Sequence, residues 1–166
     1  CIQFAKENGV ELHKKLLIEL IKEGRTFDGI CLSAVLEHVH EPSKFMSEVS
    51  ILLRQGGIIY IDCPNEPNLV TITGNFFNRL FGKKYVYNLQ PTWEPYHVFG
   101  FNPKALRILL DENNIEINEI IIHGGIGIPF VGGIKDRIKV FVAIQMQRLG
   151  NVMSLGTNMH VWGKKL

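Results

Sequence analysis

The sequence predicts an α/β protein with a mostly parallel sheet and flanking helices, and three observations support this fold class. Residues 27–33 and 58–63 are apolar runs of strand length. Residues 42–55, between them, carry apolar side chains at helical spacing. A strand, a helix and a strand in this order form a right-handed βαβ unit with parallel strands. The length of 166 residues, 46% of them hydrophobic, is enough for one domain with a buried core.

The charge balance argues against nucleic acid as a partner. Lysine and arginine number 18 and aspartate and glutamate 16, which gives a net charge of +2. The basic residues are scattered, so we expect no basic patch that would attract a phosphate backbone. The longest apolar stretch, residues 120–134, contains His123, Pro129 and several glycines, so no transmembrane segment is predicted.

The cysteine content predicts a reducing compartment. The chain has three cysteines, Cys1, Cys31 and Cys63, and the last two lie within apolar runs. An odd number in a chain of this length indicates reduced, mostly buried thiols, as in the cytoplasm, rather than a disulfide framework. Neither Cys-x-x-Cys nor His-x-x-x-His spacing occurs, so no metal site is predicted.

The elements before the βαβ unit are two helices. Residues 2–8 look like the end of one helix, which Gly9 would close. Residues 12–24 repeat leucine and isoleucine at helical spacing and end on a glycine. The strand over residues 27–33 has no clean polar–apolar alternation, which predicts that both of its faces are buried.

The βαβ unit itself has clear boundary signals. Pro42 suits the first turn of its helix, and Gln55-Gly56-Gly57 would end that helix with a glycine in the left-handed conformation. Pro64 stops the strand over residues 58–63.

Residues 66–100 are the least regular part of the chain. Asparagine, glycine, proline and aromatic residues are frequent there, and only residues 74–81 predict a short helix. A long irregular segment in a compact domain is usually a lid or a binding loop. We therefore predict that residues 66–100 form the lid or substrate segment.

The last third of the sequence predicts alternating elements. Residues 103–110 predict a helix that Asn102 would cap. Residues 115–122 predict a strand with one more polar, solvent-facing side. Residues 135–149 predict a helix and residues 158–162 a short final strand. The glycine-rich loop before that helix lacks the third glycine of a dinucleotide-binding fingerprint, because Phe130 stands in its place.

An ordered set of motifs resembles the S-adenosylmethionine-dependent methyltransferases with a Rossmann-like fold. Phe27-Asp28-Gly29-Ile30, then Leu36-Glu37-His38 and Pro42, resemble the family's fourth-strand motif. The resemblance continues in the Gly56-Gly57 turn, in Pro64-Asn65, and in Trp93-Glu94-Pro95-Tyr96-His97 followed by Phe101. It spans roughly residues 1–122 and implies the C-terminal part of a seven-stranded fold with S-adenosyl-L-methionine as cofactor.

The resemblance also implies where the cofactor binds. In open parallel sheets, ligands bind beyond the carboxyl ends of the strands. The family places the methionine part of the cofactor against the segment after the fourth strand. The implied contacts in this sequence are Ser33, Ala34, Leu36, Glu37 and His38. For the last two, a structural role, capping a turn or satisfying a buried carbonyl, remains open.

His97 is the candidate catalytic residue. It lies in a loop with Trp93, Tyr96 and Phe99, an aromatic setting suited to a flat or apolar acceptor. A histidine base that takes the acceptor's proton would accelerate transfer by about 10²–10⁴-fold, although His97 could instead anchor its loop by hydrogen bonding. The candidate substrate contacts are Asn65, Trp93 and Tyr96.

One part of the family pattern is missing from the sequence. The family's first strand with its Gly-x-Gly-x-Gly loop, and the acidic end of its second strand, do not occur before residue 27. The chain also starts with Cys1 instead of Met. We therefore expect residues 1–166 to be a partial methyltransferase domain that by itself binds the cofactor weakly or not at all. The strand over residues 27–33 would then have a free edge, through which the chain could form a homo-oligomer.

The expected function is methyl transfer from S-adenosylmethionine to a small-molecule acceptor, with an oxygen as the accepting atom. A non-catalytic methyltransferase-like scaffold or partner-binding module is the alternative, and an unrelated nucleotide-binding α/β protein is a third reading, because a fold does not fix a function. An intact glycine-rich loop in the sequence preceding residue 1 would favour the enzyme.

Overall fold

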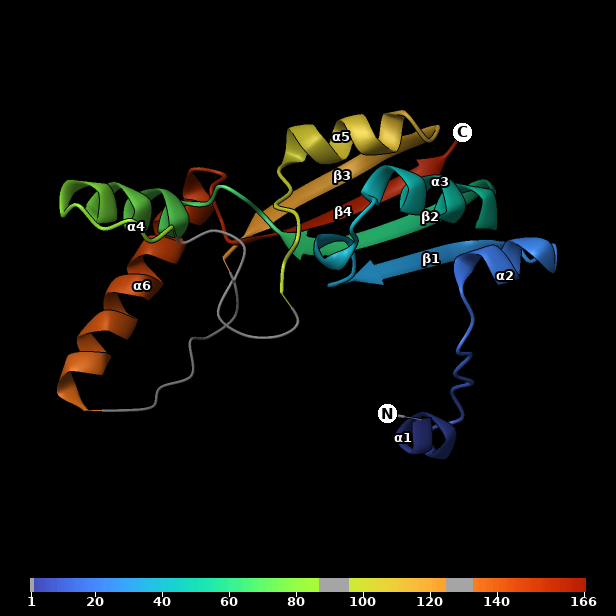
Figure 1. Cartoon of the computed structure of the whole chain (residues 1–166), viewed down its shortest axis with the longest axis horizontal. Helices are drawn as coiled ribbons and strands as arrows, with labels where there is room; N and C mark the ends of the chain where they lie inside the picture. The colour runs from blue at the N-terminus through green and yellow to red at the C-terminus, as the bar shows by residue number, and fades with distance from the viewer. Residues whose placement is uncertain (1, 87–95, 125–132) are drawn as a thin grey trace.

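The computed structural model describes residues 2–86, 96–124 and 133–166. Figure 1 shows helices packed on a central sheet, with a pair of helices beyond one end of it. The helices are α1 (Ile2–Glu7), α2 (Leu17–Lys22), α3 (Pro42–Leu52), α4 (Leu69–Leu80), α5 (Pro103–Asp111) and α6 (Ile134–Val152). The strands are β1 (Phe27–Ser33), β2 (Leu53–Pro64), β3 (Ile115–His123) and β4 (Asn158–Lys165), and a 3₁₀ turn, η1 (Leu36–His38), follows β1.

The sheet confirms the predicted fold class. Its strand order is β1-β2-β4-β3, with β1 parallel to β2. Strand β4 is antiparallel to both of its neighbours, so β1, β2 and β3 all run in the same direction. The carboxyl ends of these three strands therefore lie at one edge of the sheet, which is where α/β proteins bind ligands.

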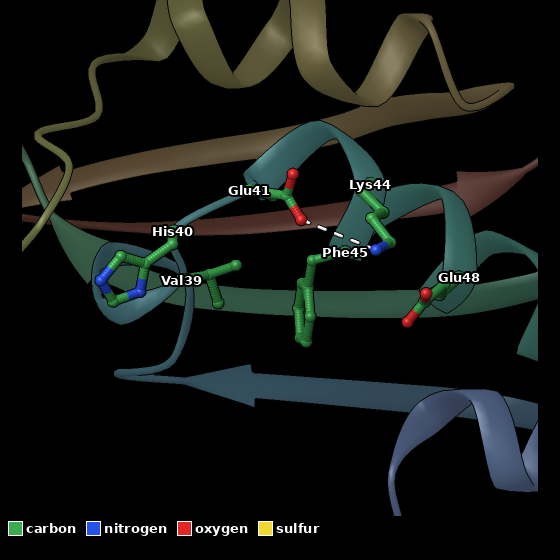
Figure 2. Close-up of a pocket in the computed structure, with 6 residues that line it drawn as sticks. All are labelled: Val39, His40, Glu41, Lys44, Phe45 and Glu48. Atoms are coloured by element: carbon green, nitrogen blue, oxygen red, sulfur yellow. Dashed lines mark ion pairs between the residues drawn. The ribbon is translucent and has the colours of Figure 1, made fainter.

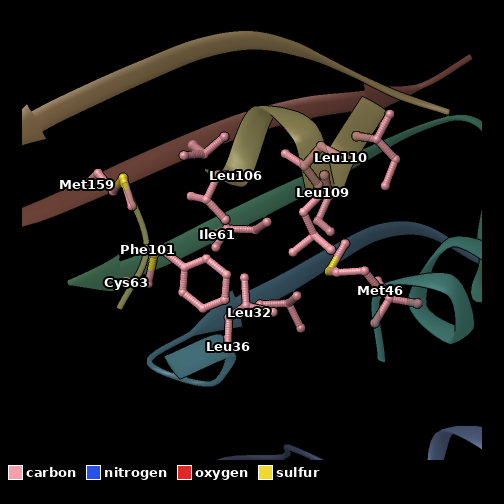
Figure 3. Close-up of a cluster of buried hydrophobic side chains, with 14 of the residues drawn as sticks. Leu32, Leu36, Met46, Ile61, Cys63, Phe101, Leu106, Leu109, Leu110 and Met159 are labelled. Atoms are coloured by element: carbon pink, nitrogen blue, oxygen red, sulfur yellow. The ribbon is translucent and has the colours of Figure 1, made fainter. Parts of the chain in front are cut away.

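The core lies between this sheet and the helices on one of its faces. From β2, Ile59, Ile61 and Cys63 point into it and are almost fully buried, as the period of a strand requires. Helices α3 and α5 cover them (Figures 1 and 3), with Leu106 of α5 fully buried. Asn102 caps α5 as predicted, because its side chain accepts a hydrogen bond from the Ala105 amide at 2.9 Å.

The opposite face of the sheet is open in the part of the chain that the structure describes. Ile58, Ile121 and Trp162 point to this face and are each 40–43% exposed. Strand β1 lies at the sheet edge and pairs with β2 on one side. The prediction that β1 is buried on both faces was therefore wrong, because helices cover only one of them.

The same geometry explains the two described cysteines, both of which are free. Cys63 points into the core, and burial raises the pKa of its thiol to about 12, so it stays protonated. Cys31 points to the open face and is exposed, contrary to the prediction of mostly buried thiols. An apolar run does not reveal that one face of its strand lacks a cover.

Several boundaries differ from those predicted. Helix α3 ends at Leu52, before the Gly56-Gly57 turn, although Gly56 does adopt the predicted left-handed conformation with φ of 76°. Helix α2 is shorter than the 12–24 pattern, and α4 is longer than 74–81. Helices α4 and α6 pack on each other beyond the carboxyl ends of β1 and β2 (Figure 1). None of the described helices is long and apolar enough to cross a membrane.

Candidate active site at the carboxyl ends of β1 and β2

Strand β1 ends in a strained turn. Ala34, directly after it, has a φ of 50°, which is uncommon for a residue with a side chain. Its amide donates to the Asp62 carbonyl at 2.9 Å, and the Ser33 hydroxyl donates to the Asp62 carboxylate at 3.2 Å. Both Ser33 and Ala34 are exposed. Strain held in place by such bonds is typical of ligand sites, and the small side chains leave the backbone accessible.

The position of the next turn, η1, is fixed by the burial of Leu36. The Leu36 side chain is fully buried in the core next to Phe101 (Figure 3), so a cofactor could contact only its backbone. Glu37 follows and is only 2% exposed. Burial of a carboxylate is costly unless its oxygens are paired, so the position of Glu37 requires an explanation from its surroundings.

A distant segment packs directly on this turn. The amides of Val98 and Phe99 both donate to the Glu37 carbonyl, at 2.7 and 3.2 Å. The ring of His38 donates from Nδ1 to the Tyr96 carbonyl at 2.9 Å, since a carbonyl can only accept. These bonds connect the two blocks of sequence that carried the resemblance, although they lie 58 residues apart.

The contact brings His97 beside Glu37 and His38. One ligand atom from each of the three residues lies within 4.8 Å of the others, and the two imidazole rings are 5.0 Å apart. The group could therefore hold a metal ion. Among the described residues, Oε2 of Glu37 has no hydrogen-bond partner although it is buried. An orphaned buried carboxylate oxygen is an acceptor available to a ligand's hydroxyl group.

Burial lowers the pKa of His97 below its ordinary value of 6.5, opposed by the nearby Glu37 carboxylate and assisted by His38. A lowered pKa leaves the imidazole neutral at physiological pH. A neutral imidazole beside an available carboxylate oxygen can accept a proton, which is the chemistry required of a general base.

The other predicted contacts differ in what they can offer. Asn65 is buried, and its side-chain amide donates to the Gly156 carbonyl at 2.8 Å, so it connects the end of β2 to the start of β4. Tyr96 is 52% exposed and free to contact an acceptor. Trp93 lies outside the described residues.

The structure also places side chains at this edge that the sequence did not single out. Asp62 on β2 lies between Ser33 and His160 of β4, at 3.5 Å from the His160 ring. His160 in turn contacts His123 at the end of β3. The only signal in the sequence was a polar residue at the end of each apolar run, which is too common to identify a site.

A separate pocket lies at the start of α3. It is lined by Val39, His40, Glu41, Lys44, Phe45 and Glu48 (Figure 2). Its Glu41–Lys44 ion pair, at 3.6 Å, is largely exposed to solvent, so it contributes little free energy. The polar atoms that converge beside His97 make the carboxyl edge of the sheet the better candidate for chemistry.

Comparisons with known proteins point to one family. Residues 2–61 match the family model described as a methyltransferase domain. The chain is 27% identical over 100 residues, 60% of its length, to the mitochondrial ubiquinone biosynthesis O-methyltransferase of Dictyostelium discoideum. It is also 27% identical over 117 residues, 70% of its length, to the human enzyme of that name. In both cases it spans about 30% of the relative's length.

A solved structure shows the same fold. The crystal structure of a SAM-dependent methyltransferase from Archaeoglobus fulgidus superposes with a TM-score of 0.51 and 17% sequence identity. The match covers 99% of this chain and 80% of that one. The sheet and helices described above are therefore those of the Rossmann-like methyltransferase fold.

Proposed function

We propose that the protein is an S-adenosylmethionine-dependent methyltransferase that transfers a methyl group to a hydroxyl oxygen of a small aromatic acceptor, since residues 2–61 match the methyltransferase domain and the chain has the fold of a solved SAM-dependent methyltransferase. The observation that carries the proposal is the cluster of Glu37, His38 and His97. In this cluster the buried Glu37 carboxylate, one of whose oxygens has no hydrogen-bond partner, lies near the neutral imidazole of His97. The cluster lies at the edge of the sheet where α/β folds bind ligands.

The residues after β1 fit the methionine part of S-adenosylmethionine. Ser33 and Ala34 are small and exposed, and Ala34 has a positive φ of 50°, so the backbone of this turn is accessible to a ligand. In this proposal Ser33, Ala34 and the backbone of Leu36 contact the methionine part of the cofactor. Glu37 and His38 form one side of the same binding site. When bound, S-adenosylmethionine supplies an electrophilic methyl group on a positively charged sulfur.

His97 and Glu37 prepare the acceptor. The acceptor hydroxyl donates its hydrogen bond to this pair, which orients the oxygen for in-line attack. Transfer would move the methyl group from the sulfonium of bound S-adenosylmethionine to this oxygen and would leave a neutral thioether. The hydroxyl proton moves to His97, which is neutral and able to take it because burial has lowered its pKa.

The proposed acceptor class is a phenolic ring of the kind found in quinone precursors. The two curated relatives carry names that refer to ubiquinone biosynthesis. Tyr96, exposed beside His97, would contact a flat ring, together with Trp93. Residues 66–100, which contain α4 and His97, would close over the acceptor as its lid. Asn65 would support this segment through the bridge that pairs it with Phe101.

Transfer of a deuterated methyl group tests the proposal. The full protein encoded by the gene is incubated with CD₃-labelled S-adenosylmethionine and a dihydroxybenzoate, and the products are analysed by mass spectrometry. We expect a product that carries one CD₃ group on oxygen. If the protein binds the cofactor but produces no methylated phenol from any of a panel of catechols, the acceptor class is wrong. Failure to bind the cofactor would favour a non-catalytic scaffold.

Three further predictions remain open. The cysteine content predicted the cytoplasm, whereas the two curated relatives are named as mitochondrial. The free edge of β1 is available for association with another strand, so a homo-oligomer remains a prediction. We also propose that residues 1–166 form part of a methyltransferase domain whose cofactor site is completed by further strands beside β1.

A further inference from the structure

A row of polar side chains crosses the open face of the sheet at its carboxyl edge. Ser33, Asp62 and His160 lie directly opposite one another on β1, β2 and β4, and His123 lies diagonally from His160 on β3. Each neighbouring pair is in contact: Ser33 with Asp62 at 3.2 Å, Asp62 with His160 at 3.5 Å, and His160 with His123 at 2.8 Å. The proposed methyl transfer uses only the first of these residues.

The contact between the two imidazoles has an unusual form. Nε2 of His123 faces Nε2 of His160 at 2.8 Å, so one nitrogen must donate and the other must present its lone pair. The opposite nitrogen of His123, Nδ1, lies 3.1 Å from the Gly124 carbonyl and must donate to it. In the neutral ring of His123, Nε2 therefore carries the lone pair, and it points at the second imidazole.

We propose that His123 and His160, with Asp62 as a third ligand, bind a divalent transition-metal ion of the zinc type. This proposal is independent of the methyl transfer. Neutral imidazole nitrogens with a carboxylate oxygen are the donor set that Zn²⁺ prefers, whereas Mg²⁺ prefers oxygen ligands alone. In the free protein the histidines share a hydrogen bond. Binding moves the proton of His160 from Nε2 to Nδ1, so that both Nε2 lone pairs face the ion.

The outer hydrogen bonds of two of these side chains are those expected of metal ligands. Metal-binding histidines usually donate their second ring nitrogen to a carbonyl, as His123 does to Gly124, and metal-binding carboxylates are themselves hydrogen-bonded, as Asp62 is to Ser33. Ligands of a tetrahedral zinc ion lie about 3.3 Å apart. The Asp62–His160 spacing of 3.5 Å already fits, and the two imidazoles need to separate by about 0.5 Å. The Asp62 carboxylate lies more than 4.8 Å from the ring nitrogens of His123, so its side chain must rotate toward His123 when the ion binds.

An ion here would join β2, β4 and β3 beside the candidate active site. All three ligands lie on strands, and the side chains of His160 and Asp62 are 34% and 27% exposed, so an ion can enter from the open face. The start of β4 also bonds Asn65, through the Thr157 and Gly156 carbonyls. The site would therefore stabilise the edge of the sheet that carries Asn65.

Calorimetry and thermal unfolding with Zn²⁺ alone test the proposal, because neither requires cofactor or acceptor. We expect micromolar binding, and a melting temperature raised by roughly 5–10 °C at a hundredfold excess of free ion over the dissociation constant. Mg²⁺ should have no such effect. The variants His123→Gln and His160→Gln should each lose one equivalent of bound zinc, and Asp62→Asn should weaken it roughly tenfold or more.

The control is His97→Gln, which alters the other group of possible ligands. This variant should still bind the one equivalent of zinc that the His123 and His160 variants lose. Melting of each variant without metal establishes that it folds. Zinc binding that is lost only in His97→Gln would overturn the proposal, as would no binding to the unmodified protein. The second result would mean that the two histidines form only a hydrogen-bonded pair.

Discussion

Replacing His97 with alanine is expected to lower turnover by about 10²–10⁴-fold, the usual contribution of a general base. The imidazole lies beside the orphaned Glu37 oxygen and is kept neutral by burial, so its loss removes the group that takes the acceptor's proton. Because the cofactor is expected to contact the turn after β1 instead, its affinity should change little. Steady-state kinetics with the cofactor and the acceptor varied separately would measure both quantities.

The pH profile separates this role from loop anchoring. Since burial lowers the pKa of His97 below its ordinary value of 6.5, the imidazole is mostly neutral at physiological pH, and kcat/KM should fall at acidic pH as it is protonated. The His97→Ala variant should lose this acid limb. His40→Ala changes an exposed histidine nearby and serves as the control. It should retain both the turnover rate of the unmodified protein and the fall of kcat/KM at acidic pH. Normal turnover in the His97 variant would reduce the residue to a structural role.

Replacing Gly156 with alanine is expected to destabilise the fold by about 1–3 kcal/mol or more, as overpacking does. A methyl group at this position would lie 2.5 Å from the carbonyl carbon and oxygen of His123. Those atoms belong to the backbone of β3 and cannot move without displacing the strand. Gly156 also accepts the bond from Asn65, so the displacement would reach the end of β2.

Chemical denaturation would measure this loss against a matched variant. Gly29→Ala adds the same methyl group to β1, where the nearest atom, the Ile58 carbonyl oxygen, lies at an ordinary distance of 3.8 Å. We expect its free energy of unfolding to stay within about 0.5 kcal/mol of the unmodified protein. Equal stability of the two variants would mean that Gly156, just before β4, does not approach the end of β3 as closely as described.

Local patterns predicted the parts of the fold that depend on neighbouring residues. The apolar spacing and the Asn102-Pro103 pair predicted α5, and the alternating residues predicted β3 within a residue of its observed end. The position of β4 between β2 and β3 could not be predicted. Its pairs with β2 join residues about 100 positions apart and its pairs with β3 join residues 35–50 positions apart, and a short apolar run carries no information about such partners.

The same limit applies to the candidate site. The sequence assigned the motif after β1 to the cofactor and the block around His97 to the acceptor, and hydrogen bonds connect these two segments. The contact of His123 with His160 was missed, because it joins residues 37 positions apart on neighbouring strands. No spacing rule for metal ligands detects such a pair. The exposure of Cys31 was missed for a related reason, since burial depends on what covers a face.

Nuclear magnetic resonance with S-adenosylhomocysteine tests the central claim, that the cofactor binds at the turn after β1. A titration of the full protein encoded by the gene, labelled with ¹⁵N, into the millimolar range detects even weak binding. We predict shift changes concentrated at the amides of residues 33–38, with smaller changes at 96–99, which bond to that turn. Changes confined to the pocket around Lys44 or to α4 and α6, or no changes at all, would contradict this assignment of the site.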